Sequence, residues 1–434
     1  VIMEKQLKSY DVVVVGGGLA GLATAAFLSF NGKKVALLER GKLGGRAVTL
    51  PIKGFNFNFG AHAIYGRDTS ILRNFQNELK LNIEWKDFNP YKARYDSGEE
   101  LSHVPSNVRG LFKTKILSSP GKIVFAWEVF KTMLSIDSGV PHQSIGKWLE
   151  KQNIGEDVKK MMLTLASSNF FTSEPEQIPS EVFFQYYKRI FTTNKPVAYI
   201  GGGWQSLINE FVRVIKENDG EIYEKAKVQQ VETTKNKVTK IMFGEEQFEA
   251  DEFVFAIPPK ELLKVFKDTE IEDWVSHYAK YKSSNVFVYD IGLSKRVESP
   301  FTYIYDRKNQ MFITDISYYD ETCIPEDGQL LQAVAYLKDE DIGNTEALEK
   351  YKQQIEALYD KHFSGWRENL AVPRISKNAV VQEIKWNMNQ QAMPIYFPDY
   401  RNTFFAGDWC QGQGQLSELS FSSAYDVCKL ILNK

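Results

Sequence analysis

A glycine-rich turn joins an apolar segment to a helical segment near the start of the chain. Residues 10–15 are predicted to form a buried strand, the turn Gly16-Gly17-Gly18-Leu19-Ala20-Gly21 follows, and residues 19–30 repeat apolar side chains at helical spacing. In this G-x-G-x-x-G pattern Gly16 permits the tight turn, Gly18 lets the backbone approach a pyrophosphate, and Gly21 lets helix and strand pack closely. The amides at the start of the helix can bind that anion. The sequence therefore predicts an α/β dinucleotide-binding fold here.

An acidic residue follows at the distance that this fold requires. Asn31-Gly32 end the helix, because both residues tolerate positive φ, and residues 35–38 form a second apolar strand. Glu39 stands at the end of that strand, where a carboxylate accepts a hydrogen bond from the adenosine ribose. A glycine turn that binds nothing is the alternative, but strand, helix and acid together favour cofactor binding.

Length and charge narrow the class of protein. The chain has 434 residues, which exceeds one ordinary core, so we expect two lobes that share a cleft. A formal net charge of -2 gives no basic excess, and nucleic-acid binding is not expected. Cys323, Cys410 and Cys428 are too scattered for a disulfide framework or a zinc site, so we expect no metal and a reducing, cytoplasmic compartment. No segment approaches the roughly 20 apolar residues of a membrane-spanning helix.

The remaining chain divides into regions by its periodicity. Residues 106–165 have a helical repeat and predict an inserted helical lobe. The other expected strands are residues 227–231, 237–243, 248–257, 286–293, 301–305, 330–336 and 403–406, and further helices are expected at 207–215, at 345–362 and at the C-terminus.

A second glycine pair, followed by an arginine, comes soon after Glu39. Gly44-Gly45-Arg46 brings a cation near the same phosphates, and Gly60-Ala61-His62 closes the next glycine segment. On these motifs the sequence resembles the large FAD-dependent family of flavin amine oxidases, protoporphyrinogen oxidases and phytoene (carotenoid) desaturases, and it is closest to the desaturase-like branch.

The resemblance implies a two-domain organisation within an α/β fold. One domain is a Rossmann-like (GR2-type) FAD-binding domain, and the other is an α+β substrate domain that carries a mixed sheet and the inserted helical lobe. We expect the discontinuous FAD-binding domain to comprise residues 1–95, 196–262 and 370–434. The substrate domain would then comprise residues 96–195 and 263–369.

Three later segments resemble further landmarks of this family. Residues 201–207 are similar to a G-G-x-x-x-L turn, residues 227–231 to the strand whose main chain contacts adenine, and residues 404–408 with 420–424 to the closing FAD motif. In that motif an acid binds ribityl or phosphate-proximal hydroxyls, and a helix N-terminus stabilises the anionic reduced flavin. The resemblance therefore implies FAD, held non-covalently. The cofactor-binding residues that it implies are Gly16, Gly18, Leu19, Ala20, Gly21, Glu39, Arg40, Gly44, Gly45, Arg46, Gly60, Ala61, His62, Val228, Gly407, Asp408, Leu416 and Ser417.

Two positions depart from the family pattern. Asn58 stands where the family commonly has an aspartate, so no carboxylate serves at that place. Ser423 stands where the family usually has glycine, at a point of close approach. Neither departure removes the fold or FAD from the prediction.

The segments that mark amine oxidases carry other residues here. Flavin amine oxidases typically have a lysine that is water-bridged to the flavin N5, and our alignment puts Asn285 in that place, with Lys282 three residues away. Some members attach the flavin through a cysteine, and residues 386–396 contain none. Met393-Pro394-Ile395-Tyr396 instead resembles the desaturase branch. We therefore expect an FAD-dependent oxidoreductase that takes hydride from the carbon framework of an apolar, isoprenoid-like or tetrapyrrole-like, small-molecule substrate.

Two other functions stay open at this point. One is a flavin amine oxidase that produces hydrogen peroxide, and the other is a non-redox prenyl- or lipid-binding protein on the same fold. No catalytic residue is predicted. His62 and Tyr65 are candidates for the flavin face, because the matching family segment runs past the isoalloxazine, although a hydrogen-bonded structural role is the more common one for a histidine. Trp409 and Gln411 are candidates for closing the cavity.

Residues 111–134 mix large apolar side chains with Lys113, Lys115, Lys122 and Lys131. Such a segment either packs as an ordinary helical core or rests on an anionic membrane and admits a lipid-like substrate. We expect core packing, with peripheral membrane contact as the alternative.

Overall fold

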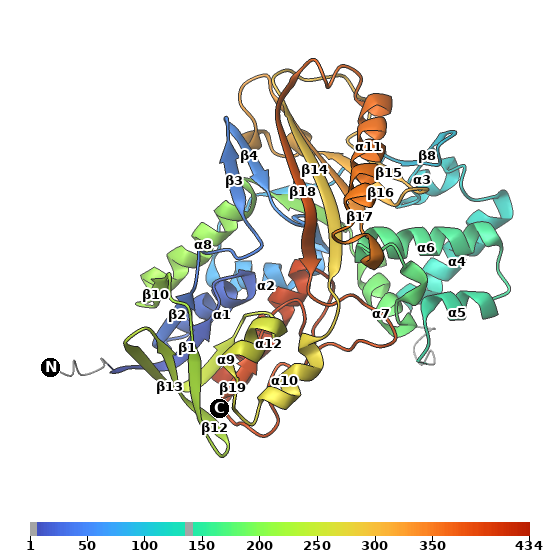
Figure 1. Cartoon of the computed structure of the whole chain (residues 1–434). Helices are drawn as coiled ribbons and strands as arrows, with labels where there is room; N and C mark the ends of the chain where they lie inside the picture. Colours follow the sequence, from blue (N-terminus) through green and yellow to red (C-terminus); the bar gives the residue numbers. More distant parts are fainter. Residues whose placement is uncertain (1–6, 135–141) are drawn as a thin grey trace.

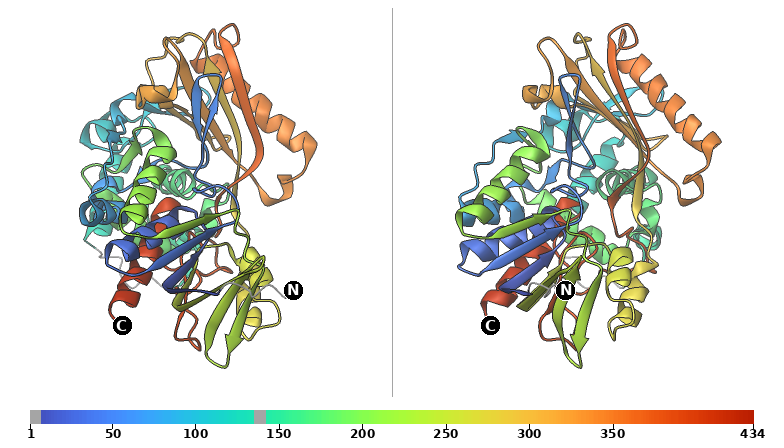
Figure 2. Two further views of the ribbon diagram at one scale, coloured as in Figure 1. Left: turned by 90° about the vertical axis from the view of Figure 1, so that its left-hand side faces the viewer. Right: turned by 60° about the vertical axis from the view of Figure 1, so that its left-hand side comes forward.

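The computed structural model of the chain describes residues 7–134 and 142–434. Within these ranges it contains two large β-sheets and a helical lobe (Figure 1). The two sheets lie one above the other in each view (Figure 2), and the lobe packs against the second sheet. The expected domain segment 1–95 and the expected helical region 106–165 include residues 1–6 and 135–141, which lie outside the described residues.

The first sheet is the layer that the glycine motif predicts. Its order is β10-β2-β1-β13-β12-β11, with β19 beside β13. β10, β2, β1, β13 and β19 run parallel, whereas β12 pairs antiparallel with both β13 and β11. Val12 and Val13 of β1 are fully buried, on opposite faces, because a central parallel strand is covered on both sides. The strands are β1 (Leu7–Val15), β2 (Val35–Glu39), β10 (Glu221–Glu224), β11 (Gln230–Thr234), β12 (Lys237–Phe243), β13 (Glu246–Phe255) and β19 (Thr403–Phe405).

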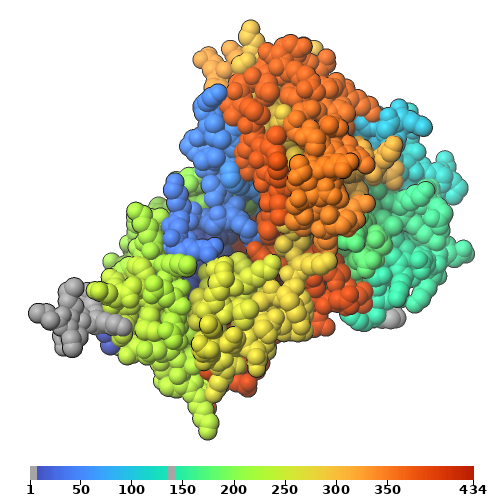
Figure 3. Space-filling model, viewed as in Figure 1, coloured from blue at the N-terminus to red at the C-terminus, as the bar shows by residue number. Residues whose placement is uncertain are grey.

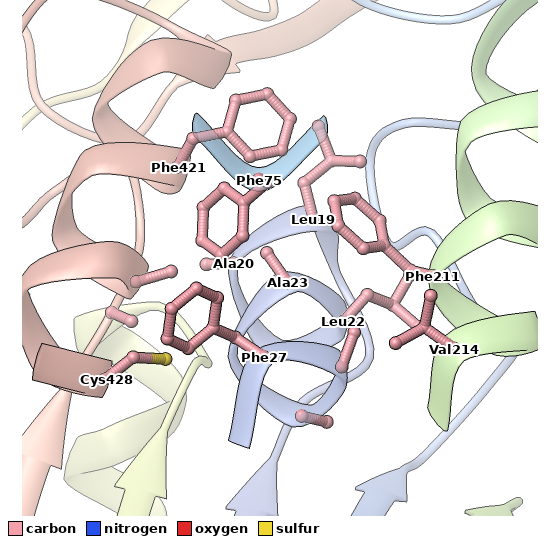
Figure 4. Packing of buried hydrophobic residues seen from close by; sticks show 14 of the residues in the cluster. Leu19, Ala20, Leu22, Ala23, Phe27, Phe75, Phe211, Val214, Phe421 and Cys428 are labelled. Atoms are coloured by element: carbon pink, nitrogen blue, oxygen red, sulfur yellow. The ribbon is translucent and has the colours of Figure 1, made fainter. Parts of the chain in front are cut away.

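Helix α1 (Leu19–Phe30) is apolar around almost its whole circumference, and its residues 19–29 are all buried. It packs against α2 (Ile71–Leu79), α8 (Gly203–Glu217) and α12 (Ser417–Leu432). Phe27 of α1 meets Phe75 edge to face, and Phe211 and Phe421 complete the aromatic contact (Figure 4). This packing fixes the N-terminus of α1 at the end of β1.

The second sheet has the order β18-β14-β17-β16-β15-β7-β8. It is mixed, because β15 and β7 are parallel while the other neighbours are antiparallel. Helix α11 (Thr345–His362) packs on one face of β14, and Val286 and Val288 of β14 face the helical lobe on the other. The strands are β7 (Ala93–Asp96), β8 (Leu101–His103), β14 (Ser284–Leu293), β15 (Tyr303–Asp306), β16 (Met311–Asp315), β17 (Gln329–Tyr336) and β18 (Leu370–Gln382).

The helical lobe lies between β8 and β9 in the chain. The remaining elements connect the two large sheets and the lobe. They are two small sheets, β3-β4 and β5-β9-β6, and helices α9 and α10. In the ranges that the structure describes, every helix is too short or too polar to cross a membrane. The helices of the lobe are α3 (Val108–Lys113), α4 (Ser119–Met133), α5 (Ile145–Lys151), α6 (Glu156–Phe170) and α7 (Ser180–Phe191). The connecting elements are α9 (Pro259–Val265), α10 (Glu272–Ala279), β3 (Thr49–Ile52), β4 (Phe55–Asn58), β5 (Ile64–Tyr65), β6 (Trp85–Asp87) and β9 (Val197–Ile200).

The expected fold class is confirmed, but two local expectations differ from the structure. β18 pairs with β14 along most of its length, so residues 370–382, expected in the FAD-binding domain, lie in the second sheet, as does β7, which crosses the expected boundary at residue 95. β18 is the edge strand of that sheet, which is why it accommodates Pro373. β11 begins at Gln230 rather than at residue 227, so Val228 lies in the segment before the strand.

Candidate functional site

A cavity of about 720 Å³ opens at the carboxyl ends of β1, β2 and β13. In an open parallel sheet this edge is where ligands bind. The turn after β1 forms one wall, and segments from far along the chain form the others. These segments are residues 39–47, 59–61, 226–229, 256–258 and 407–409, the end of β18 and the start of α12.

The glycine turn has the backbone that a phosphate cradle needs. A Cβ on Gly16, whose φ is +104°, would lie 2.5 Å from the carbonyl oxygen of Ala256. A Cβ on Gly21 would lie 1.8 Å from the carbonyl oxygen of Gly16, so Gly21 sits at the contact of helix and turn. Gly18 faces the cavity with no atom within 4 Å of a Cβ built on it. The turn is therefore closed toward the sheet and open toward a ligand.

Glu39 holds the loop that surrounds this turn. Its Oε2 accepts a hydrogen bond from Gly17 N at 2.6 Å, and its Oε1 accepts one from Gly41 N at 2.6 Å. The carboxylate lines the cavity and retains lone pairs for a ribose hydroxyl. Glu39 thus shapes the loop in addition to the ribose contact that the motif predicts.

Arg46 and Asp408 form an ion pair in the lining of the cavity. Nη2 of Arg46 lies 2.6 Å from both carboxylate oxygens of Asp408. Burial alone would lower the pKa of Arg46, but Asp408 and the neighbouring Glu383 raise it overall. Burial raises the pKa of Glu383, partly offset by Arg46. The pair places a fixed positive charge and a hydrogen-bonding carboxylate beside the two glycine motifs. A dinucleotide requires such groups for its phosphates and hydroxyls.

Ser423 fits the position where the family usually has glycine. Its Oγ accepts a hydrogen bond from Gly407 N at 2.9 Å, which ties α12 to the turn that carries Asp408. Trp409 also lines the cavity, and its buried Nε1 has no partner in the described part of the chain. The open backbone at Gly18 and the Arg46–Asp408 pair are the groups of this cavity that fit a bound dinucleotide. Gln411 is exposed and does not line the cavity.

The cavity brings together most of the residues that the motifs predict. Gly21, His62 and Leu416 are outside its lining, and Gly21 serves packing instead. The predicted residues that line it are Gly16, Gly18, Leu19, Ala20, Glu39, Arg40, Gly44, Gly45, Arg46, Gly60, Ala61, Val228, Gly407, Asp408 and Ser417. Glu383 also lines it, although no motif had marked it.

The two flavin-face candidates lie behind or beside the cavity lining. His62 is 7% exposed, and its ring packs 5.5 Å from that of Tyr199. Burial lowers the pKa of His62 to about 4, so the imidazole is neutral at pH 7. Tyr65 packs against the cluster between the second sheet and the helical lobe, where burial raises its pKa. Neither side chain offers a charged group to the cavity at neutral pH.

Asn58 caps a helix, which explains why a neutral residue suffices there. Its Oδ1 accepts hydrogen bonds from Trp204 N at 3.1 Å, at the start of α8, and from Thr49 Oγ1 at 2.6 Å. A carboxylate does lie at this helix end, because Asp320 Oδ2 accepts a hydrogen bond from Gly202 N at 2.8 Å. Asp320 comes from a distant segment, so the sequence offered no sign of this role.

One wall of the interior between the sheets and the lobe is apolar. Val286 and Val288 of β14 belong to the same cluster as Val334, and Ala61, from the cavity lining, packs against it. Asn285 bonds to Ser283 and Asn378, and by strand alternation it faces away from that cluster. Lys282 Nζ lies 2.7 Å from Asp339, and its side chain is 64% exposed.

The fold and the cavity together define a dinucleotide-binding oxidoreductase. A family model for flavin containing amine oxidoreductases matches residues 19–432, so the chain belongs to that family. The expected family, the FAD cofactor and the oxidoreductase class are thereby confirmed.

Individual relatives fall in both branches. The chain is 26% identical over 276 residues to a 15-cis-phytoene desaturase from Glycine max, covering 58% of this chain and 48% of the relative. It is 23% identical over 285 residues to amine oxidase [flavin-containing] A from Equus caballus, covering 60% and 52%. The chain thus spans about half the length of these relatives. A solved oxidoreductase from Methanosarcina mazei shares the fold, with a TM-score of 0.80 at 17% identity over 97% of this chain and 100% of that one.

Proposed function

We propose that this protein is an FAD-dependent dehydrogenase, of the desaturase or oxidase type, that takes hydride from the carbon framework of an apolar substrate. The apolar wall of β14 is the observation that carries this proposal. Val286 and Val288, next to the position that aligns with the lysine of amine oxidases, belong to a buried apolar cluster, and Lys282 lies at the surface on Asp339. An uncharged wall binds an isoprenoid or a tetrapyrrole framework better than a charged amine.

Three tyrosines accompany this wall. Tyr336 belongs to the same apolar cluster, Tyr303 and Tyr65 pack against it, and burial raises the pKa of each phenol above its usual value. Neutral phenols hydrogen-bond a substrate but do not accept a proton from it at neutral pH. The wall therefore orients the substrate and excludes water, and no dedicated base is required.

The residues of the cofactor cavity would each hold a different part of FAD. FAD, when bound, supplies the hydride acceptor. The Gly16–Gly21 turn and Glu39 would hold its adenosine and pyrophosphate, and Arg46 with Asp408 would hold the central part. The start of α12 lines the cavity at Ser417, where the helix dipole favours negative charge on the reduced ring.

Anaerobic flavin reduction tests this proposal. We expect a polyene or a porphyrinogen to bleach the visible flavin bands of the purified holoprotein, and a panel of primary and secondary amines to leave them unchanged. Bleaching by an amine with hydrogen peroxide release in air would contradict the proposal in favour of an amine oxidase. A protein that binds a prenyl chain yet holds no flavin after reconstitution would favour the non-redox alternative.

We further propose that the helical lobe docks on an anionic membrane. Its outer surface, which we call the aromatic–basic face, carries Ile123, Trp127, Phe130 and Leu134 at helical spacing along and just beyond α4. Ile123 is 75% exposed, and Phe112 on the adjacent α3 is 74% exposed. The lobe forms the right-hand side of the molecule in Figure 3, coloured cyan to green. Such an exposed apolar stripe is unusual on a monomeric soluble surface.

The charges around the aromatic–basic face suit anionic lipid. Glu128, the single acid of residues 108–134, is buried and paired with Lys131 at 2.7 Å. Each basic residue near an anionic surface adds about 1 kcal/mol of attraction, reduced by salt. The basic residues of this segment are Arg109, Lys113, Lys115, Lys122 and Lys131.

Sedimentation with liposomes tests the docking. We expect the holoprotein to pellet with vesicles of phosphatidylcholine and phosphatidylserine, less so at high salt, and not with phosphatidylcholine alone. The double substitution of Trp127 and Phe130 by Glu should abolish pelleting. Leu430→Glu, at an exposed apolar residue of α12, is the matched control and should pellet normally. Equal recovery of wild type in every supernatant would contradict the proposal.

A further inference from the structure

Glu383 brings a second carboxylate to the pair of Arg46 and Asp408. It follows β18 and lines the cofactor cavity, and its main-chain N donates to Asp408 Oδ2 at 3.3 Å. Arg46 Nη1 donates to Val380 O at 3.4 Å, so the end of β18 is tied to both members of the pair. Two acids and one arginine therefore share one wall of the cavity.

The carboxylate of Glu383 differs from the other acids of the lining in having no partner. In the part of the chain that the structure describes, no donor forms a hydrogen bond or an ion pair with it. Each of the other acids is already paired. These acids are Asp408, Glu39 and Glu261, which pair respectively with Arg46, with two main-chain amides, and with Arg40 and Lys264. A ligand in the cavity therefore meets Glu383 as its one unpaired acid among the described residues.

The phosphate cradle lies against the loop that carries Arg46. Gly44 N donates to Gly17 O at 2.7 Å, and a Cβ on Gly45 would lie 3.2 Å from Gly18 Cα. Gly18 is open to the cavity at the N-terminus of α1, which is where a pyrophosphate binds. A pyrophosphate therefore comes close to a wall that carries two acids and one arginine, and each of its phosphates adds a negative charge.

The surroundings of Glu383 favour its neutral form. Burial raises the pKa of Glu383, and Asp408 raises it further, while Arg46 and Lys260 offset this only in part. These three groups come from the turn after β19, the loop after β2 and the start of α9. A further negative charge nearby raises the pKa of a carboxyl again. A neutral carboxyl also has an O–H to donate, whereas a carboxylate only accepts.

We propose that Glu383 is a cofactor-binding residue that takes up a proton from the solvent when FAD binds. Its neutral carboxyl donates the O–H to an oxygen of the pyrophosphate, beside the pair of Arg46 and Asp408. The affinity for FAD then falls as pH rises, because the carboxylate must be protonated before this wall accepts the cofactor. The inference concerns the cofactor alone, so it holds for any substrate and does not depend on the proposed function.

Titration of the deflavinated protein with FAD between about pH 5.5 and pH 8.5 tests this proposal. Above the pKa that Glu383 has without FAD, we expect Kd to rise by about tenfold per pH unit until the pKa in the complex is reached. Glu383→Gln has a permanent neutral donor, so its Kd should stay level and lie about tenfold or more below that of wild type at pH 8.5. A wild-type Kd without any slope would overturn the proposal. Weaker binding by Glu383→Gln at every pH would also overturn it, because Glu383 would then act as an acceptor.

Calorimetry counts the proton directly. The heats of FAD binding in two buffers with different ionisation enthalpies give the number of protons taken up, which should approach one for wild type and zero for Glu383→Gln. Glu261→Gln changes a cavity acid that is already paired with Arg40 and Lys264, and it should keep the wild-type slope of Kd against pH. Proton uptake that persists in Glu383→Gln would assign the proton to another group. Wild type alone refutes the proposal if its heats show no uptake.

Discussion

Replacing Glu39 with alanine should weaken FAD binding through the loop that Glu39 holds. The side chain is 9% exposed and accepts two main-chain hydrogen bonds, from Gly17 N and Gly41 N, both at 2.6 Å. A hydrogen bond to a charged group contributes roughly 1.5–3 kcal/mol, and the two loop bonds exist before FAD binds, so the ribose contact is the one bond whose loss acts on Kd directly. Because FAD must reorder the released loop, we expect a loss of about 2 kcal/mol, or roughly 30-fold in Kd.

Titration of the deflavinated protein with FAD, followed by quenching of flavin fluorescence, measures this loss. Glu39→Gln retains one acceptor and should lose about half as much free energy, near 1 kcal/mol. Glu246→Ala removes a surface carboxylate that pairs with Lys8 on the same sheet, and should bind FAD as wild type does. A Kd for Glu39→Ala within twofold of wild type would refute the reasoning. A lower apoprotein stability with unchanged Kd would make Glu39 a purely structural residue.

Substitutions at three further positions test the surrounding residues. His62 has a pKa lowered to about 4 from 6.5, so the unfolded chain binds a proton first and stability falls by about 3 kcal/mol as pH drops from 6.5 toward 4. Urea unfolding of His62→Gln at pH 7 and pH 4.5 should show a smaller decrease than wild type, and an equal decrease would argue against the buried neutral histidine. Asn58→Ala should lose about 1–2 kcal/mol in the same assay by uncapping α8, while Asn58→Asp keeps the acceptor and loses less. Lys282→Ala should leave the rate of flavin reduction unchanged, because Nζ of Lys282 pairs with Asp339 at the surface. A tenfold slower reduction would instead indicate that Lys282 acts at the flavin.

Local patterns predicted the parts of the fold that depend on neighbouring residues. The glycine turn, helix Leu19–Phe30 and helix Thr345–His362 were predicted to the residue, because periodicity and helix ends are encoded within a few positions. β18 was missed, since Pro373 argues against a strand and only its place at the sheet edge makes the proline acceptable. Glu383 follows that strand, and no motif marks it, so its place in the cavity depends on the same non-local pairing.

The apolar wall of β14 shows that strand pairing, more than alignment by motif, decides which side chains face the interior. Asn285 and Val286 are adjacent in β14, and side chains of adjacent strand residues point to opposite faces, so a shift of one residue exchanges the polar face for the apolar one. The alignment placed Asn285 at the lysine position, but Asn285 bonds to Asn378 on the face away from the interior cluster, and Val286 faces the interior instead. Either register leaves this stretch of β14 without a lysine, so the argument against an amine oxidase does not depend on the alignment. Which residue faces the interior does depend on the alignment. Because that residue is valine, the wall favours a hydrocarbon framework over one with hydrogen-bonding groups.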